Sequence, residues 1–254
     1  MSPKLFDLTG KVALVTGGNK GLGLAMARGF AEAGADLYIA SRNEGELKAA
    51  AEAIGSATKR KVLYSVCDVA DRKQVDALGK LAEQKMGRVD ILINNAGMNQ
   101  PQPIDQISDE VWDRILEVNL SSCMALTRAV APGMKARKWG RVVHISSIMG
   151  LVSKEKRNAY SATKAALVGL CRASALGLGP YGVTVNCIAP GPFLTDMPMS
   201  ILSDAEKKVF SDRTALGRWG QPAELVGPAI FLASDAGSYV SGHCLFVDGG
   251  YTAR

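Results

Sequence analysis

Tyr160 and Lys164, four residues apart, are the pair in this chain best suited to acid–base chemistry. In a helix, positions i and i+4 lie on one face, so the ammonium group would lie beside the phenol. A free phenol is a poor acid or base at neutral pH, but a nearby cation favours the phenolate form. The pair is therefore predicted to give and take a proton near pH 7. A surface tyrosine beside a solvated lysine has the same spacing, so the pair alone is a weak signal.

A glycine-rich turn lies near the start of the chain, between a predicted buried strand at 12–15 and a predicted amphipathic helix. Gly17, Gly21 and Gly23 form the turn with Gly-x-x-x-Gly-x-Gly spacing. Glycines let the backbone approach a phosphate closely, and the N-terminus of the helix adds free N–H groups and the positive end of its dipole. The sequence therefore predicts a dinucleotide site, although a tight connection without a ligand also uses such glycines.

The residues after the second predicted strand, 37–40, indicate which dinucleotide is bound. An acidic residue at this position would hold the ribose hydroxyls of NAD, whereas an arginine, here Arg42, accommodates the 2′-phosphate of NADP. Lys20, inside the glycine turn, adds a second positive charge. Solvated loop cations are the alternative interpretation. We expect NADP(H) to be preferred, with NAD(H) as the second cofactor.

Several further motifs follow in order along nearly the whole chain. They are Thr16 to Gly23, Asp68-Val69, Asn94 to Gly97, Asn119, Ser146-Ser147, Tyr160 with Lys164, Pro190-Gly191 with Thr195, and Val247 to Gly250. Together they resemble the short-chain dehydrogenase/reductase family, in which a serine usually lies 13 residues before the tyrosine, as Ser147 does here. The resemblance implies an NAD(P)-dependent oxidoreductase that acts on a secondary alcohol or a ketone.

The resemblance also implies catalytic roles for four residues. Tyr160 would be the general acid in reduction and the general base in oxidation, and Lys164 would assist it and hold the nicotinamide ribose. Ser147 would donate a hydrogen bond to the substrate carbonyl, so that two hydroxyls stabilise the developing negative charge. Asn119 would position a water molecule that links Lys164 to solvent.

The cofactor-binding residues implied by the resemblance extend over most of the chain. They are Gly17, Asn19, Lys20, Gly21, Leu22, Gly23, Ser41, Arg42, Asp68, Val69, Asn95, Ala96, Gly97, Tyr160, Lys164, Pro190, Gly191, Phe193 and Thr195. Asp68 and Val69 would hold the adenine, Asn95 to Gly97 would line the adenosine ribose, and Phe193 and Thr195 would meet the nicotinamide carboxamide.

Seven strand-like runs alternate with helical stretches, which predicts an α/β fold with one doubly wound, Rossmann-type parallel sheet and helices on both faces. The runs are 12–15, 37–40, 62–66, 91–94, 141–145, 183–188 and 243–247. We expect one domain over residues 1–254, with the cofactor at the carboxyl edge of the sheet. Residues 192–220 are predicted to form a mobile lid with an apolar lining from Met197, Met199 and Ile201; packing of these side chains against the core is the alternative.

Composition excludes several other classes of protein. The chain of 254 residues is 47% apolar and 21% charged, as is ordinary for a globular domain. No apolar run is long enough to cross a membrane, and the N-terminus has no signal region. Five scattered cysteines argue against a disulfide framework or a zinc site, so we expect a cytoplasmic protein without a metal or a membrane partner. The resemblance implies a homotetramer that packs through helices at 108–128 and 159–178.

The substrate is indicated less directly. The net charge is +6, and Lys154, Lys156 and Arg157 directly precede the tyrosine, where a basic rim would attract an anionic substrate. A solvated charged loop is an equally good interpretation. Residues 213–225 and 238–242 resemble gluconate 5-dehydrogenases, which favours a sugar acid, whereas 186–197 is shared with 3-oxoacyl-carrier-protein reductases. The latter activity, or general carbonyl reduction, is the alternative.

Two interpretations from other classes of protein are available. The first is a non-catalytic dinucleotide-binding protein, although such a protein would not need Asn119, Ser147, Tyr160 and Lys164 together. The second is nucleic-acid binding through the basic stretch at 132–180. No interleaved aromatic residues and no helix-turn-helix pattern support it, so we expect no nucleic-acid partner.

Overall fold

Seven short runs rich in Val, Ile and Leu form one parallel sheet in the described part of the chain, residues 3–195, 199 and 202–253 of a computed structural model. The strands are β1 Val12–Thr16, β2 Asp36–Ser41, β3 Val62–Val66, β4 Ile91–Asn94, β5 Gly140–Ile145, β6 Val183–Pro190 and β7 Cys244–Val247. Every residue of β1, β4, β5 and β6 is buried, as expected for parallel strands that are covered on both faces. This explains why they are continuous apolar runs rather than alternating ones.

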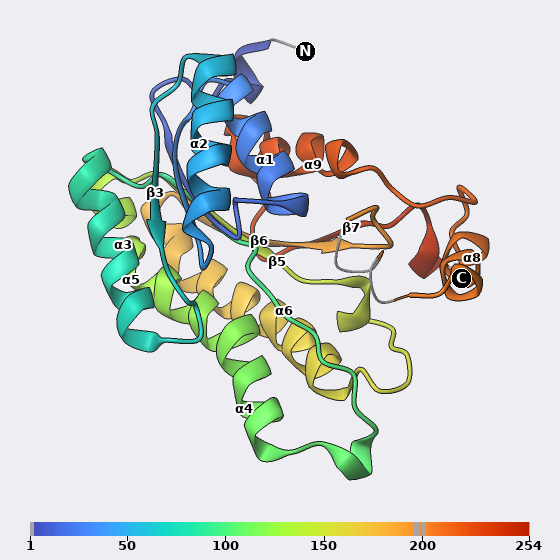
Figure 1. The fold of residues 1–254 in the computed structure, drawn as a ribbon. Coiled ribbons are helices and arrows are strands. Elements are labelled where there is room, and N and C mark those ends of the chain that lie inside the picture. Colours follow the sequence, from blue (N-terminus) through green and yellow to red (C-terminus); the bar gives the residue numbers. More distant parts are fainter. Residues whose placement is uncertain (1–2, 196–198, 200–201, 254) are drawn as a thin grey trace.

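The strand order is β3-β2-β1-β4-β5-β6-β7 (Figure 1). The chain moves outward in one direction from β1 to β3 and then returns to the other side of β1 with β4. The order of connection therefore reverses between β1 and β4. Ligands of open α/β sheets bind beyond the carboxyl ends of the strands at such a point.

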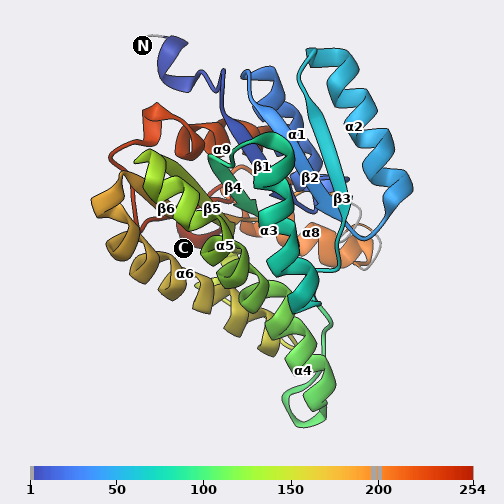
Figure 2. The ribbon, with the colours of Figure 1, turned by 90° about the vertical axis from the view of Figure 1, so that its left-hand side faces the viewer.

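Helices cover both faces of the sheet (Figures 1 and 2). On one face lie α1 Gly21–Glu32, α2 Glu44–Thr58 and α9 Val226–Ala233. On the other lie α3 Arg72–Met86, α5 Ser122–Arg137 and α6 Asn158–Leu178. Helix α4, Asp109–Leu116, projects from the body in both views, and α8, Asp204–Arg213, lies at one side of it.

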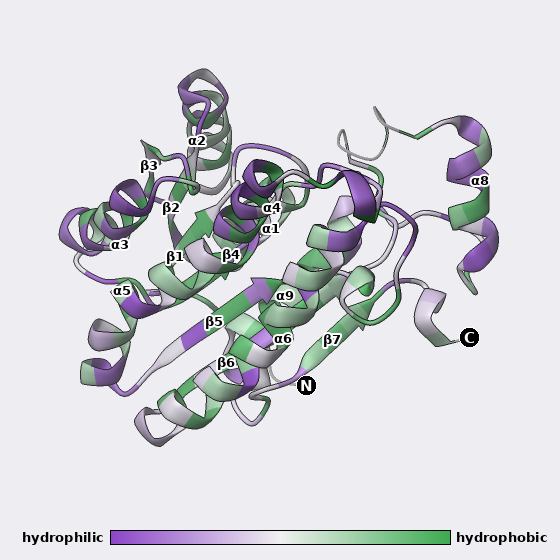
Figure 3. Cartoon of the chain, turned by 90° about the horizontal axis from the view of Figure 1, so that it is seen from below, coloured by the Kyte–Doolittle hydropathy of each residue, from purple (hydrophilic) through white to green (hydrophobic). Residues whose placement is uncertain are grey.

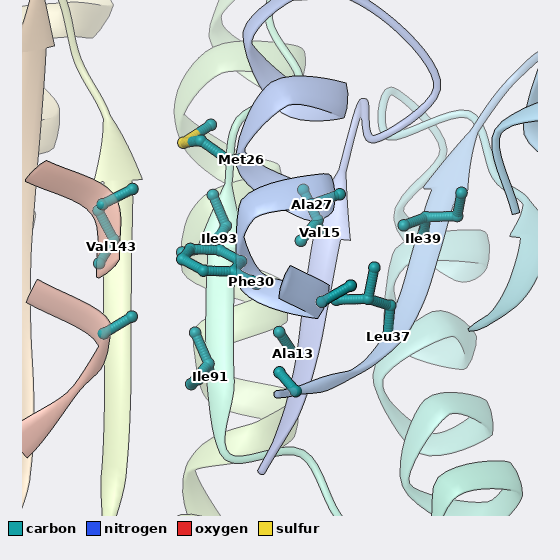
Figure 4. Packing of buried hydrophobic residues seen from close by; sticks show 14 of the residues in the cluster. Ala13, Val15, Met26, Ala27, Phe30, Leu37, Ile39, Ile91, Ile93 and Val143 are labelled. Atoms are coloured by element: carbon teal, nitrogen blue, oxygen red, sulfur yellow. The ribbon is translucent and has the colours of Figure 1, made fainter. Parts of the chain in front are cut away.

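The core on the first face is built from α1 and the strands beneath it (Figure 4). Met26, Ala27 and Phe30 are spaced so that they share one side of α1, and they pack with Val15 and Ile93. Phe30 is completely buried, which stabilises the fold by roughly 1.5–3 kcal/mol. Because α1 begins at the glycine turn, this packing also fixes the position of that turn. Figure 3 shows the contrast with α8, which is largely hydrophilic and has no buried residue.

The predicted fold class is confirmed, with differences at the ends of some elements. The expected strand at 243–247 begins at Cys244, and His243 precedes it. The expected continuous helix at 108–128 is interrupted by a π-helical turn at Glu117–Ser121, between α4 and α5. In the described residues, no helix has the length and apolar character that crossing a membrane would require.

One fully buried histidine, His144 on β5, lies in a polar cluster inside the core. Its Nδ1 is 3.0 Å from Asn94 Nδ2, and since the amide nitrogen can only donate, Nδ1 is the acceptor and Nε2 carries the proton. Burial, with a smaller effect from the charge of Lys164, lowers the pKa of His144 from 6.5 to about 4. The imidazole therefore stays neutral in the folded protein at neutral pH.

Stability should fall on acidification because of this histidine. Between pH 6.5 and about 4 the unfolded chain takes up a proton at His144 that the folded protein excludes. In this window the free energy of unfolding decreases as the pH falls, by up to about 3 kcal/mol from this residue. Urea unfolding of the wild type and of His144→Gln at several pH values measures the difference, and the variant should lack this part of the acid loss.

His243→Gln, at the exposed second histidine, is the matched control and should alter the pH dependence by less than about 0.5 kcal/mol. An acid loss in His144→Gln as large as that of the wild type would contradict the assignment.

Candidate active site

A cavity of about 1110 Å³ opens at the carboxyl edge of the sheet, at the place where the strand order reverses. Its walls include the segments that follow β1, β2, β3, β4, β5 and β6, together with the start of α6. All nineteen predicted cofactor residues and three of the four predicted catalytic ones line it, so segments far apart in the sequence meet here. Those that line it are Gly17, Asn19, Lys20, Gly21, Leu22, Gly23, Ser41, Arg42, Asp68, Val69, Asn95, Ala96, Gly97, Ser147, Tyr160, Lys164, Pro190, Gly191, Phe193 and Thr195.

 The predicted catalytic residue that does not line the cavity is Asn119.

Tyr160 and Lys164 lie one turn apart on α6, as their spacing predicts. Lys164 is only 3% exposed, and its Nζ donates a hydrogen bond of 2.7 Å to the carbonyl of Ile145, the last residue of β5. The same Nζ is 5.5 Å from the centre of the Tyr160 ring. A buried ammonium group needs such a partner, so the Ile145 carbonyl holds the cation beside the phenol.

Ser147 follows β5 and faces the same cavity. Its Oγ accepts a hydrogen bond of 3.1 Å from the backbone N–H of Met149, which leaves the hydroxyl proton available to another acceptor. The neighbouring Ser146 Oγ donates to the backbone carbonyl of Lys164 at 2.7 Å. This bond ties the serine segment to α6, so the hydroxyls of Ser147 and Tyr160 line one cavity beside a cation.

Asn119 lies behind the cavity wall and is completely buried in the π-helical turn. Its side chain accepts from the backbone N–H of Met98 at 2.8 Å and donates to the Met98 carbonyl at 2.9 Å. A Cβ built on Gly97 would be 3.4 Å from Asn119 Oδ1 and 3.5 Å from Lys164 Nζ. The amide and the ammonium group therefore approach the same point. Turns of this kind inside helices are frequent at functional sites.

The glycine turn has the shape that a dinucleotide phosphate requires. Gly17 and Gly21 have φ angles of +64° and +55°, which side chains rarely adopt. A Cβ on Gly23 would be 2.1 Å from the Gly17 carbonyl oxygen, so only glycine fits there. Asn95 Nδ2 donates to the carbonyl of Thr16 at 2.9 Å and ties the turn to the end of β4. The first turn of α1 therefore remains open to an anionic ligand.

The end of β2 offers hydrogen-bond donors without partners in the described part of the chain. Ser41 Oγ is buried, lines the cavity and has no hydrogen-bond partner. Arg42 is exposed, lines the cavity and forms no ion pair among the described residues. The carboxylate of Glu46, also in the cavity wall, accepts a hydrogen bond from Asn19. A buried hydroxyl beside a free guanidinium group fits a phosphate ester, and the glycine turn fits a pyrophosphate.

The remaining predicted cofactor residues lie in other parts of the cavity wall. The Asp68 carboxylate accepts a hydrogen bond of 3.4 Å from Arg114. Arg114 also lines the cavity and was not predicted from the sequence. A Cβ on Gly191 would be 2.6 Å from the Cα of Asp248, so this glycine allows the two segments to touch. Met199 N donates to the carbonyl of Thr195 at 3.2 Å. Met197 and Ile201, predicted to line the lid, lie outside the described residues.

The lining also contains apolar residues that had not been predicted. They are Met98, Val118, Ile148, Met149, Leu202, Phe210 and Trp219. Phe210 on α8 packs edge to face with Trp219, with ring centres 5.5 Å apart. Both aromatic residues lie within the predicted lid, and this position was the sequence signal that could have identified them. Their contact joins separate segments, so it could not be predicted from the spacing of residues in the sequence.

The three cations of the predicted basic rim have different environments. Lys154 forms an ion pair of 3.1 Å with Glu206 on α8. Lys156 is exposed, has a φ of +63° and does not line the cavity. Arg157 is partly buried and does line it. The rim is therefore not a uniform charged surface.

Comparisons with known proteins agree with this geometry. A family model described as Enoyl-(Acyl carrier protein) reductase matches residues 17–252. Gluconate 5-dehydrogenase of Gluconobacter oxydans (strain 621H) is 39% identical over 254 residues, with 98% of each chain covered. The 3-oxoacyl-(acyl-carrier-protein) reductase FabG of Chlamydia muridarum (strain MoPn / Nigg) is 38% identical, with 96% of this chain and 98% of that one covered.

A solved structure extends the comparison to the fold. The crystal structure of a gluconate 5-dehydrogenase from Burkholderia cenocepacia J2315, in complex with NADP and tartrate, matches with a TM-score of 0.95. The sequences are 37% identical, and all of each chain is covered. The chain described here therefore belongs to the short-chain dehydrogenase/reductase family of NAD(P)-dependent oxidoreductases.

Proposed function

We propose that this protein is an NADP(H)-dependent oxidoreductase that interconverts a ketone and a secondary alcohol. The observation that carries the proposal is the continuity of one cavity. Its lining includes the glycine turn and Arg42 as well as Ser147, Tyr160 and Lys164. A dinucleotide held along the first set, with its nicotinamide ribose at Lys164, would leave the hydroxyls of Ser147 and Tyr160 free for a substrate carbonyl.

The chain's own residues would move the proton and stabilise the negative charge. NADPH, when bound, would supply the hydride. The Ser147 and Tyr160 hydroxyls would both donate to the carbonyl oxygen as negative charge develops there. Tyr160 would then give up its proton, a step favoured by the ammonium group of Lys164. Asn119, close to Lys164, would help to return a proton from solvent through a water molecule.

NADP is the preferred dinucleotide in this proposal. Ser41 Oγ and Arg42 would both donate to a 2′-phosphate, and Lys20 would add a positive charge in the same cavity. The NADP present in the Burkholderia cenocepacia structure supports this choice by similarity.

A sugar acid is the substrate class that we favour. The gluconate 5-dehydrogenases among the relatives support it, and so does a cation, Arg157, in the cavity wall. A 3-oxoacyl-(acyl-carrier-protein) reductase is the second candidate, supported by a relative of nearly equal identity. The apolar residues Met149, Phe210 and Trp219 in the lining would suit an acyl chain.

Residues 192–220 would act as a lid over the substrate. Helix α8 lies in this segment and is joined to the loop before α6 by the Lys154–Glu206 ion pair. Lys154 Nζ also lies 5.6 Å from the centre of the Phe210 ring. These exposed contacts are individually weak, so they could form and break as the lid moves.

Replacing Tyr160 separates an enzyme from a non-catalytic binding protein. Tyr160→Phe removes the proton donor and should lower kcat for ketone reduction by about 10²–10⁴-fold. The dissociation constant for NADPH, measured by fluorescence, should change by only about twofold. Tyr239→Phe, at a fully exposed tyrosine, is the control and should leave both quantities unchanged. Undiminished turnover in Tyr160→Phe would refute the proposed role.

Replacing Arg42 tests the choice of cofactor. Arg42→Leu should lower kcat/KM for NADPH by about 10–100-fold, because a charge-assisted hydrogen bond is lost, and should leave kcat/KM for NADH nearly unchanged. Lys48→Leu, at an exposed cation on α2 that does not line the cavity, should affect neither. A wild-type protein that prefers NADH at least about tenfold would refute the assignment.

A cytoplasmic homotetramer is the proposed state of the chain. All five cysteines are free thiols, which suits a reducing compartment. The projecting α4 bears Trp112, 36% exposed, and α6 bears Leu176, 81% exposed, so both helices named by the family resemblance offer apolar side chains to a partner. Light scattering should give about four times the mass of 26.8 kDa. A monomeric mass at micromolar concentration would contradict the proposal.

A further inference from the structure

Arg157 is a partly buried cation in the cavity wall that has no role in the steps described above. It directly precedes α6, three residues before Tyr160, so the two side chains lie about one helical turn apart. Both line the cavity. Arginine stays charged in proteins, and a charge in a cavity wall usually has a partner.

In the described part of the chain, the guanidinium group of Arg157 has no such partner. No hydrogen bond and no ion pair of its side chain occurs there, and its Nη1 is shielded from solvent without an acceptor. Burial lowers the pKa of Arg157, while negative charge on Tyr160 and Glu206 opposes that effect. An unpaired buried N–H group in a native structure calls for an explanation, and a ligand that is absent from the structure is one.

The neighbouring charged groups do not supply the missing partner. Glu206 is the acid that interacts with Arg157 through its charge, but its carboxylate is bonded to Lys154 and to the backbone and side chain of Ser203. Glu155 is exposed. Gln102 pairs with Arg157 in an isolated β-bridge, and its Oε1 is also buried and has no partner among the described residues. A neutral amide cannot balance a charge.

We infer that Arg157 binds the carboxylate of the substrate and thereby selects a short anionic carbonyl compound. The inference rests on the proposed function, because it places the carbonyl of that compound at Ser147 and Tyr160. A carboxylate accepts two parallel hydrogen bonds from a guanidinium group, which would satisfy the buried donor and fix the orientation of the substrate. Lys154, paired with Glu206, and Lys156, outside the cavity, do not compete for it.

The test compares an anionic ketone with a neutral one. With NADPH, kcat/KM is measured for 5-keto-D-gluconate and for butane-2,3-dione. Arg157→Leu should lower the value for the anion by about 10–100-fold, mainly through KM, and the value for the dione by no more than about twofold. Arg157→Lys, which keeps the charge but not the forked geometry, should lie between the wild type and Arg157→Leu.

Lys156→Asn is the matched control. It removes one positive charge from the adjacent residue, and asparagine tolerates the positive φ of that position. Both substrates should be affected by no more than about twofold. Equal losses for both substrates in Arg157→Leu, or a loss in Lys156→Asn as large as that in Arg157→Leu, would overturn the inference. If Arg157→Leu does not fold, Arg157→Gln replaces it in the test, once its melting temperature shows that it is folded.

Failure of the proposed function would look different. A wild-type protein that reduces neither compound nor any other ketone would refute the proposed function. The binding of a carboxylate by Arg157 would still be testable. In that case D-gluconate binding to the NADP-bound protein is measured by calorimetry. Binding that weakens by at least about tenfold in Arg157→Leu supports the proposal that Arg157 binds the carboxylate. Equal binding by the wild type and Arg157→Leu, or no binding by either, overturns it.

Discussion

The hydrogen bond between the Lys164 ammonium group and the Ile145 carbonyl is the contact on which the site depends. Lys164 is almost completely buried, and a buried cation without an acceptor would destabilise the fold. The bond therefore fixes α6 against the end of β5. It also sets the position of Tyr160 one turn earlier on the helix and of Ser147 two residues after the strand.

The rest of the cavity is arranged around this contact by the order of the strands. The reversal between β1 and β4 brings the glycine turn to the carboxyl edge, near the ends of β5 and β6. Among the described residues, polar atoms without partners occur at two places in the cavity wall, Ser41 Oγ at the end of β2 and Arg157 Nη1 just before α6. A cofactor with a phosphate and a substrate with a carboxylate would satisfy them. This gives one physical reason for both proposed preferences.

Much of the fold could be predicted from the sequence because its signals are local. Each strand is a short apolar run, and the glycine turn and the Tyr160–Lys164 spacing are each contained in a few residues. The ion pair of Lys154 with Glu206 joins residues 52 positions apart, so the sequence could not show which cation of the rim is free. The π-helical turn at Asn119 was also missed, because its residues fit an ordinary helical pattern.

Direct transfer of hydrogen from cofactor to substrate tests the central claim most directly. NADPH carrying deuterium at C4, on one face and then on the other, is incubated with the protein and 5-keto-D-gluconate, and the product is analysed by mass spectrometry and NMR. Deuterium from one face alone is expected on the carbon of the new alcohol, with none lost to solvent. A product without deuterium from either face, or no oxidation of NADPH with any ketone, would contradict it.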